Sequence, residues 1–206
     1  MPVNKSTPCV IIGAREPGPM VIPEGAFVIV CDGGFAHLGQ IRPDLIIGDF
    51  DSLGYVPEAD CPVVQLPPEK DDTDIMAALR KGLELGFREF ILYGCMGGRP
   101  DHAYANFQVL GWLTAHGARG QLRGDGWTIT HIENASITFS GRPGCFFSVF
   151  APEGEAMGVS IQNAKYILDR YAMSGAFPIG VSNEFVNADP VTVSVENGKL
   201  LIMWEA

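Results

Sequence analysis

The feature of this sequence that most restricts its fold is a series of short apolar runs that each end at a glycine or a polar loop. They lie at residues 8–13, 26–31, 45–47, 63–66 and 90–93. Each run is too short for a buried helix and has the composition of a strand that is buried on both faces. Helical spacing of apolar residues follows two of them, in stretches that stop at Gly86 and Gly117. Strands that alternate with helices predict an α/β domain with a mostly parallel sheet over residues 1–118.

The pattern changes from Gly120 onward, where helical spacing no longer persists. Short β-rich runs follow one another at 127–132, 136–139, 145–150, 158–161, 191–195 and 200–204. The last two flank Asn197-Gly198, and Asn-Gly between β-rich runs is a strong hairpin signal. We therefore predict a second, all-β domain over residues 119–206, built as an antiparallel sandwich or barrel.

Composition excludes several classes of function. The chain of 206 residues carries 14 basic and 24 acidic side chains, and its net charge of −10 argues against non-specific binding to nucleic acid or membrane surfaces. No apolar run reaches the roughly 18–20 residues that a membrane span needs, and no signal-peptide pattern is visible. The five cysteines are widely spaced without a Cys-x-x-Cys pair. We therefore expect reduced thiols and a cytoplasmic protein.

Two carboxylates follow the run at 45–47, in the segment Gly48-Asp49-Phe50-Asp51. Residues two apart in an extended segment point to the same side, so Asp49 and Asp51 can face one point. Clustered carboxylates repel each other unless a cation lies between them, and Mg²⁺ prefers such hard oxygen ligands. We interpret the pair as a candidate metal site, and the alternative is a turn without a ligand.

Two further polar loops precede helical segments. Asp32-Gly33-Gly34 follows the second run, and its glycines allow a ligand to approach the backbone closely. Lys70-Asp71-Asp72-Thr73-Asp74 precedes the first helix. Acidic residues there suit the helix dipole, but their density favours a second cation or a polar group of a substrate. The alternatives are a tight turn for the first loop and simple capping for the second.

A fourth polar loop, residues 97–102, follows the run at 90–93 and reads Gly-Gly-Arg-Pro-Asp-His. Arg99 has the fork geometry that suits phosphate oxygens, and Asn106 lies one helical turn beyond His102. The alternatives are a surface ion pair between Arg99 and Asp101 and a His102 that binds nothing. Since ligands of open α/β sheets bind at the carboxyl ends of the strands, we expect all four loops to meet there.

Taken in this order, the motifs resemble those of the thiamine pyrophosphokinase family. The β-rich part contributes one more, Gly180-Val181-Ser182-Asn183-Glu184-Phe185. The resemblance implies an N-terminal α/β nucleotide domain, a C-terminal β-sandwich, and a homodimer that holds thiamine between the catalytic domain of one subunit and the β domain of the other. The implied reaction transfers the pyrophosphoryl group of ATP to the hydroxyl of thiamine, with Mg²⁺ as cofactor, and gives thiamine diphosphate and AMP.

The resemblance also implies roles for single residues. Catalytic roles fall to Asp49, Asp51, Asp74, Arg99 and Asp101, of which the three carboxylates Asp49, Asp51 and Asp74 would hold Mg²⁺. Nucleotide and metal contacts fall to Asp32, Gly33, Gly34, Asp71, Asp72, Thr73, Gly98, His102 and Asn106. For Asp71 or Asp72 the alternative is a contact with the aminopyrimidine of thiamine. Thiamine contacts fall to Ser182 and Asn183. The sequence departs from the family at Trp127, where relatives often have an Asp-x-x-Asn-like turn, and this residue packs in the core or stacks on a ring.

Three other interpretations account for parts of the sequence. A strand followed by Asp49-Phe50-Asp51 also resembles the haloacid-dehalogenase phosphatases, but those need a lysine and an acidic pair after later strands, and Lys70-Asp71-Asp72 comes too early. Transfer to another alcohol, such as a pterin, is a closer alternative. The third is a non-catalytic thiamine- or nucleotide-binding protein, although a pure binder has little use for a metal site.

Overall fold

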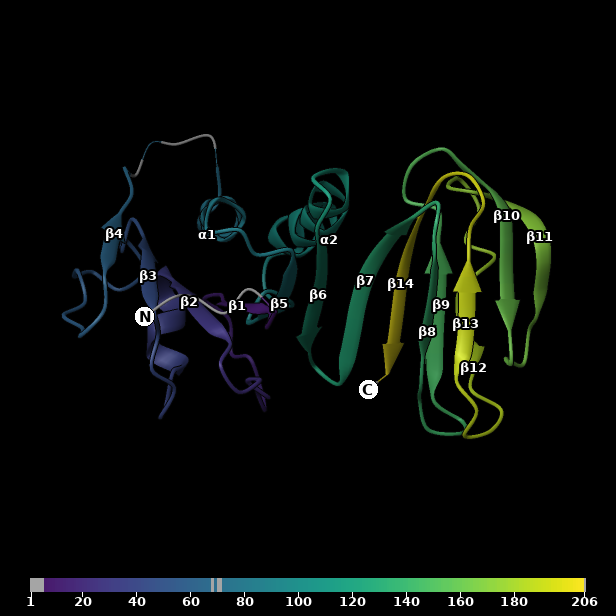
Figure 1. Ribbon diagram of the computed structural model, residues 1–206, viewed down its shortest axis with the longest axis horizontal. Coiled ribbons are helices and arrows are strands. Elements are labelled where there is room, and N and C mark those ends of the chain that lie inside the picture. The colour runs from purple at the N-terminus through teal and green to yellow at the C-terminus, as the bar shows by residue number, and fades with distance from the viewer. Residues whose placement is uncertain (1–5, 68, 70–71, 206) are drawn as a thin grey trace. The chain divides into compact units, whose positions relative to one another are not determined.

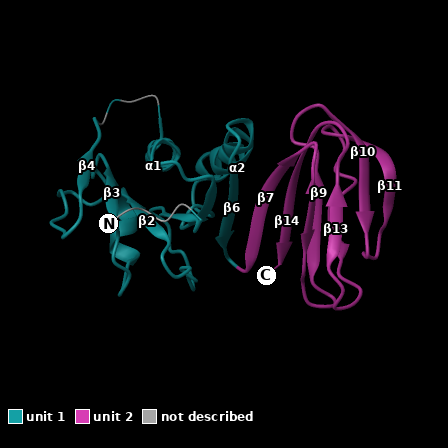
Figure 2. Ribbon diagram, in the orientation of Figure 1, with its two compact units in different colours: residues 1–125 teal, residues 126–206 magenta. Residues whose placement is uncertain are grey.

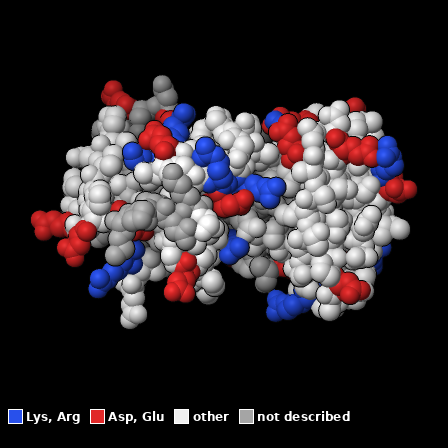
Figure 3. Space-filling model, viewed as in Figure 1, with Lys and Arg blue, Asp and Glu red and all other residues white. Residues whose placement is uncertain are grey.

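The computed structural model describes residues 6–67, 69 and 72–205 (Figure 1). The chain divides into two compact units, Met1–Asp125 and Gly126–Ala206 (Figure 2). Within the described part of the chain, no helix is long and apolar enough to cross a membrane. Acidic and basic side chains are interspersed on the face shown in Figure 3 rather than gathered by sign.

Unit 1 is built on a sheet in which all the neighbouring strands run parallel. The order across it is β6-β5-β1-β2-β3-β4. Its strands are β1 (Cys9–Ile12), β2 (Phe27–Cys31), β3 (Leu45–Gly48), β4 (Val63–Gln65), β5 (Glu89–Tyr93) and β6 (Arg119–Gly124). The strands β1 and β3 are buried along their whole length, which explains why these runs are apolar without alternation. The domain boundary predicted from the sequence, after residue 118, falls just before β6, whereas unit 1 includes β6 and ends at Asp125.

Two α-helices and one 3-10 helix complete unit 1. They are α1 (Asp74–Glu84), α2 (Pro100–Ala115) and η1 (Asp32–His37). The Thr73 hydroxyl caps α1 by accepting a hydrogen bond from the Met76 amide at 3.2 Å. Gly86 and Gly117 follow the two α-helices with φ of 93° and 68°, a backbone conformation that favours glycine at a helix end. The predicted helix stops are therefore confirmed.

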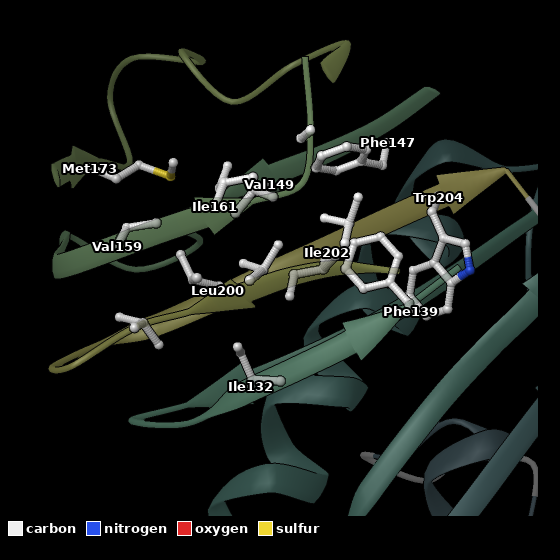
Figure 4. Close-up of a cluster of buried hydrophobic side chains, with 14 of the residues drawn as sticks. Ile132, Phe139, Phe147, Val149, Val159, Ile161, Met173, Leu200, Ile202 and Trp204 are labelled. Atoms are coloured by element: carbon white, nitrogen blue, oxygen red, sulfur yellow. The ribbon is translucent and has the colours of Figure 1, made fainter. Parts of the chain in front are cut away.

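Unit 2 consists of two antiparallel sheets with orders β12-β9-β14-β7 and β11-β10-β13-β8. Its strands are β7 (Trp127–Glu133), β8 (Ser136–Phe139), β9 (Phe146–Phe150), β10 (Glu155–Gln162), β11 (Leu168–Ser174), β12 (Asn183–Glu184), β13 (Val191–Ser194) and β14 (Lys199–Glu205). Apolar side chains from both sheets form one core, in which Phe139 stacks on Trp204 with ring centroids 4.7 Å apart (Figure 4). The predicted fold class, a parallel α/β part followed by an antiparallel sandwich, is confirmed.

The hairpin predicted at Asn197-Gly198 is wrong. The flanking strands β13 and β14 lie in different sheets, where β13 pairs with β8 and β10 while β14 pairs with β7 and β9. Gly198 has a φ of 118°, so the glycine allows a sharp reversal, but that reversal carries the chain from one layer of the sandwich to the other.

Candidate functional site

A cavity of about 690 Å³ opens in unit 1 at the carboxyl ends of the strands. The segments that follow β1, β2, β3 and β5 all contribute to its wall, together with the first turns of α1 and α2. It is lined by Gly13, Ala14, Arg15, Cys31, Asp32, Gly33, Ala36, Asp49, Asp51, Ser52, Leu53, Thr73, Asp74, Ile75, Gly94, Cys95, Gly97, Arg99, His102 and Asn106. The structure therefore brings described residues from all four polar loops to one place, as expected of a parallel sheet.

Three carboxylates meet in this cavity. One ligand oxygen from each of Asp32, Asp49 and Asp51 lies within 4.8 Å of the other two. The Asp32 side chain is 4% exposed, and its Oδ1 has no hydrogen-bond partner among the described residues. A buried carboxylate oxygen without a partner costs free energy unless a cation or a proton satisfies it. Three oxygen donors of this kind fit Mg²⁺.

The close approach of Gly48 to Asp32 helps to bring these carboxylates together. A Cβ at Gly48 would lie 3.0 Å from both Cβ and the amide nitrogen of Asp32, so a larger residue there would crowd Asp32. Phe50 adopts a φ of 61° and is 3% exposed, which turns its ring into the core between the two outward carboxylates. The Asp51 amide donates a hydrogen bond to Oδ1 of Asp49 at 3.3 Å.

Two predicted residues of the site have other surroundings. Asp74 lines the cavity as the first residue of α1. Among the described residues, however, the cluster of three carboxylates contains Asp32 in place of Asp74. Gly34 is buried against the end of β1, where an added Cβ would lie 2.5 Å from the carbonyl oxygen of Ile12, and it does not line the cavity. Gly33, next to it, does.

Arg99 and Asp101 form a two-contact ion pair at the start of α2. Nε of Arg99 donates to Oδ1 at 3.2 Å and Nη2 donates to Oδ2 at 2.6 Å. These hydrogen bonds raise the pKa of Arg99 and are the largest cause of the lowering of the Asp101 pKa to about 2. His102 and Asn106 line the same wall, and Asn106 donates its amide to the Cys95 carbonyl at 2.7 Å.

Asp72, just before α1, makes its contact with a residue of that helix. Asp72 does not line the cavity, and its Oδ2 lies 2.9 Å from Nε of Arg80. The guanidinium of Arg80 in turn lies over the ring of Trp112 at 5.5 Å from its centroid. Thr73 lines the cavity and caps α1. Lys70 and Asp71 lie outside the described residues.

The two residues predicted to contact thiamine lie in unit 2. Ser182 is exposed, with a φ of 57°, and its amide donates to Oγ of Ser148 at 3.1 Å. Asn183 is 4% exposed, and its side-chain amide is used inside the unit. Its Oδ1 accepts from the Tyr166 amide at 3.0 Å and its Nδ2 donates to the Tyr166 carbonyl at 2.7 Å. Asn183 therefore holds the segment at Tyr166, whose ring is exposed.

Arg15 is the functional candidate that the sequence interpretation missed. It lines the cavity just after β1, and its amide donates to the Gly94 carbonyl at 3.1 Å. Its guanidinium lies against Gly98, which does not itself line the cavity: a Cβ added at Gly98 would overlap it. The sequence does contain a signal for Arg15. It lies two residues after Gly13, at the carboxyl end of the first apolar run, and the other polar loops also follow the carboxyl ends of such runs.

Family profiles match both parts of the chain. Residues 20–121 match a profile described as the catalytic domain of thiamin pyrophosphokinase, and residues 135–200 match one described as its vitamin B1 binding domain. Comparison with curated protein sequences gave no significant match.

Solved structures share the fold. Thiamine pyrophosphokinase from Bacillus subtilis is 21% identical, with a TM-score of 0.85 over 97% of this chain and 99% of that one. Thiamin pyrophosphokinase from Geobacillus thermodenitrificans is 23% identical, with a TM-score of 0.80 over 96% and 97%. The enzyme from Candida albicans is 12% identical, with a TM-score of 0.75 over 97% and 89%.

Proposed function

We propose that this chain, which belongs to the thiamin pyrophosphokinase family, transfers the pyrophosphoryl group of ATP to thiamine and releases AMP. One observation carries the proposal: a cavity of nucleotide size combines three clustered carboxylates with the guanidinium of Arg99. Small-molecule sites commonly enclose about 300–1,000 Å³, and this cavity lies in that range. Phosphoryl chemistry needs positioning and charge neutralisation, which these groups supply.

In this proposal the carboxylates bind the metal. Asp32, Asp49 and Asp51 would hold Mg²⁺, and Asp74 would contribute from the same cavity. Bound Mg²⁺ neutralises charge on the polyphosphate and helps to orient it. The buried Asp32 oxygen supports this role, because a cation satisfies it where none of the described residues donates a hydrogen bond to it.

The remaining residues bind and orient the reacting groups. In the proposed step the thiamine hydroxyl oxygen bonds to the β-phosphorus while the bond from that phosphorus to the α–β bridging oxygen breaks. AMP leaves, and the hydroxyl proton is released to water. Arg99 binds oxygens of the transferred group, and Asp101 holds the guanidinium in place through its two hydrogen bonds. His102, Asn106, Gly33 and Thr73 border the nucleotide.

Unit 2 is proposed as the thiamine-binding and dimerisation domain. It exposes a set of large apolar side chains near Ser182 in sequence, namely Tyr166, Ile167, Phe177, Ile179, Val181 and Val186. Exposed apolar groups of this size favour contact with a second protein surface. We propose a homodimer in which Ser182 reaches thiamine in the partner's cavity and Asn183 acts by holding Tyr166. Five free cysteines agree with the proposed cytoplasmic location.

Product analysis tests the reaction. Purified protein is incubated with thiamine, ATP and Mg²⁺, and the products are separated by chromatography. AMP and thiamine diphosphate in equal amounts are expected, and Asp51→Asn should abolish both, whereas Asp60→Asn, an exposed carboxylate outside the cavity, should not. ADP with thiamine monophosphate would overturn the proposal, as would binding of thiamine without any product.

Subunit mixing tests the shared site. Protein with both Ser182→Ala and Asn183→Ala is mixed with Asp51→Asn protein under conditions that exchange subunits. Heterodimers should regain activity, because one of their two sites carries no substitution. Absence of recovery, with exchange demonstrated by mass, would contradict a site built from two subunits.

A further inference from the structure

Arg15 differs from Arg99 in having no side-chain partner among the described residues. No hydrogen bond or ion pair of its guanidinium is found with any described residue, although Arg15 lines a cavity that holds several carboxylates. Arg99, by contrast, is paired with Asp101. An unpaired guanidinium beside a cavity keeps all its donors available for a ligand.

A glycine lies directly against this guanidinium. Gly98 has a φ of 71°, and a Cβ built on it would overlap Cζ and Nε of Arg15. The backbone of Arg15 is fixed as well, because its amide donates to the Gly94 carbonyl at 3.1 Å. The side chain is therefore held between the end of β1 and the glycine turn that leads to Arg99.

The strand order separates the charges of the cavity. Arg15 follows β1 and Arg99 follows β5, and these two strands are neighbours. Asp32 follows β2 while Asp49 and Asp51 follow β3, and those strands are neighbours on the other side. The two arginines of the cavity wall thus follow β5 and β1, and the three clustered carboxylates follow β2 and β3. An extended polyanion that carries a divalent cation matches such a wall.

We propose that Arg15 is a second phosphate-binding residue of this cavity, and that its guanidinium binds non-bridging oxygens of the polyphosphate chain opposite the carboxylate cluster. The identification of that chain as the triphosphate of ATP rests on the proposed function. Guanidinium groups suit phosphate because their planar fork donates two parallel hydrogen bonds. The absence of a side chain at Gly98 then has a functional reason, since it leaves room for the guanidinium.

Calorimetric titration with inorganic tripolyphosphate and Mg²⁺ tests the proposal without catalysis or nucleotide. Arg15→Met should weaken binding by about 10- to 100-fold, as expected for loss of a charged hydrogen-bonding group. Arg15→Lys should recover part of the affinity, because the charge returns without the fork. Arg42→Met removes an exposed arginine outside the cavity and should bind like the wild type.

Glycine variants test the placement. Gly98→Ala should weaken tripolyphosphate binding, because its methyl group displaces Arg15. Gly117→Ala imposes similar backbone strain at a φ of 68° with open space around it, so it should lose some stability but no affinity. Wild-type affinity in Arg15→Met, or no binding by the wild type, would overturn the proposal. Loss of binding in Arg15→Met with no thiamine diphosphate formed by the wild type would uphold Arg15 and reject the proposed reaction.

Discussion

Arg99 and Asp101 face each other across two hydrogen bonds, of 3.2 and 2.6 Å, although both side chains are exposed. The pair is the main reason why the pKa of Asp101 falls from 3.8 to about 2. A lowered pKa means that the ionised form is favoured by folding, so the contribution is present above pH 3.8 and is lost as the pH falls through about 2. The pair is therefore intact at neutral pH.

The first prediction concerns the pKa of Asp101, measured by NMR of the carboxyl groups. Asp101 should titrate near pH 2 in the wild type and return toward 3.8 in Arg99→Met, because the hydrogen bonds from Arg99 that lower its pKa most are then gone. An Asp101 titration that is the same in both proteins would show that the pair does not persist in solution.

Metal binding provides the second prediction. Asp32→Asn, Asp49→Asn and Asp51→Asn should each weaken Mn²⁺ binding, measured by electron paramagnetic resonance, by at least about tenfold, because each removes one negatively charged ligand. Asp60→Asn, which lies outside the cavity, is the matched control. Unchanged affinity in Asp32→Asn would remove Asp32 from the metal site and leave its buried oxygen without an explanation.

The ion pair of Asp72 with Arg80 provides the third prediction. Asp72→Asn and Arg80→Leu should each lower the free energy of unfolding by about 0.5–1 kcal/mol, since the pair is partly exposed and lies over Trp112. The double variant should lose little more than either single variant in urea denaturation. If Asp72 also contacts metal or substrate, its replacement will lower turnover far more than Arg80→Leu does.

Asn183 provides the fourth prediction. Asn183→Ala should lower the free energy of unfolding of the protein by about 2–3 kcal/mol, because it removes a buried amide that makes hydrogen bonds to the backbone of Tyr166. Ser182→Ala is the control next to it, and because that side chain is exposed its effect on stability should be small. Equal stability of the two variants would contradict the anchoring role of Asn183.

Thiol reactivity provides the fifth prediction. Burial raises the pKa of Cys95 to about 12 and that of Cys31 well above its ordinary value, so little thiolate is present at pH 8. Iodoacetamide should therefore label the partly exposed Cys61 and Cys145 first, as read by peptide mass spectrometry. Rapid labelling of Cys95 in folded protein would mean that the wall of the cavity opens.

Much of unit 1 could be predicted because its signals are local. The buried strands β1 and β3 are continuous apolar runs, and the glycines after α1 and α2 mark the helix ends. The meeting of the polar loops follows from the rule for parallel sheets. The family resemblance inferred from those loops is confirmed by the two profiles that match.

The remaining features depend on contacts between distant residues. Strand β6 has glycine and charged residues along its length, and only its pairing with β5 places it in the parallel sheet. Strand β11 is mostly exposed, with little alternation to reveal it. Asn197-Gly198 has the same turn chemistry whether the next strand pairs with the last one or crosses to the other layer. Local sequence cannot distinguish these cases.

In the candidate site, too, some residues could be found from local sequence and others only from contacts between distant residues. Asp49 and Asp51 could be found from their spacing, but the position of Asp32 beside them depends on how closely Gly48 approaches it. The proximity of Arg15 to Gly98 depends on the neighbouring positions of β1 and β5. Both are tertiary contacts, which single motifs do not encode.

The most direct test of the central claim follows the phosphorus atoms of ATP. Protein is supplied with thiamine, Mg²⁺ and ATP that carries radioactive phosphorus at either the α or the γ position. Pyrophosphoryl transfer predicts that the γ label appears in thiamine diphosphate and the α label in AMP. Appearance of the γ label in thiamine monophosphate or in free phosphate, with the α label in ADP, would contradict the account.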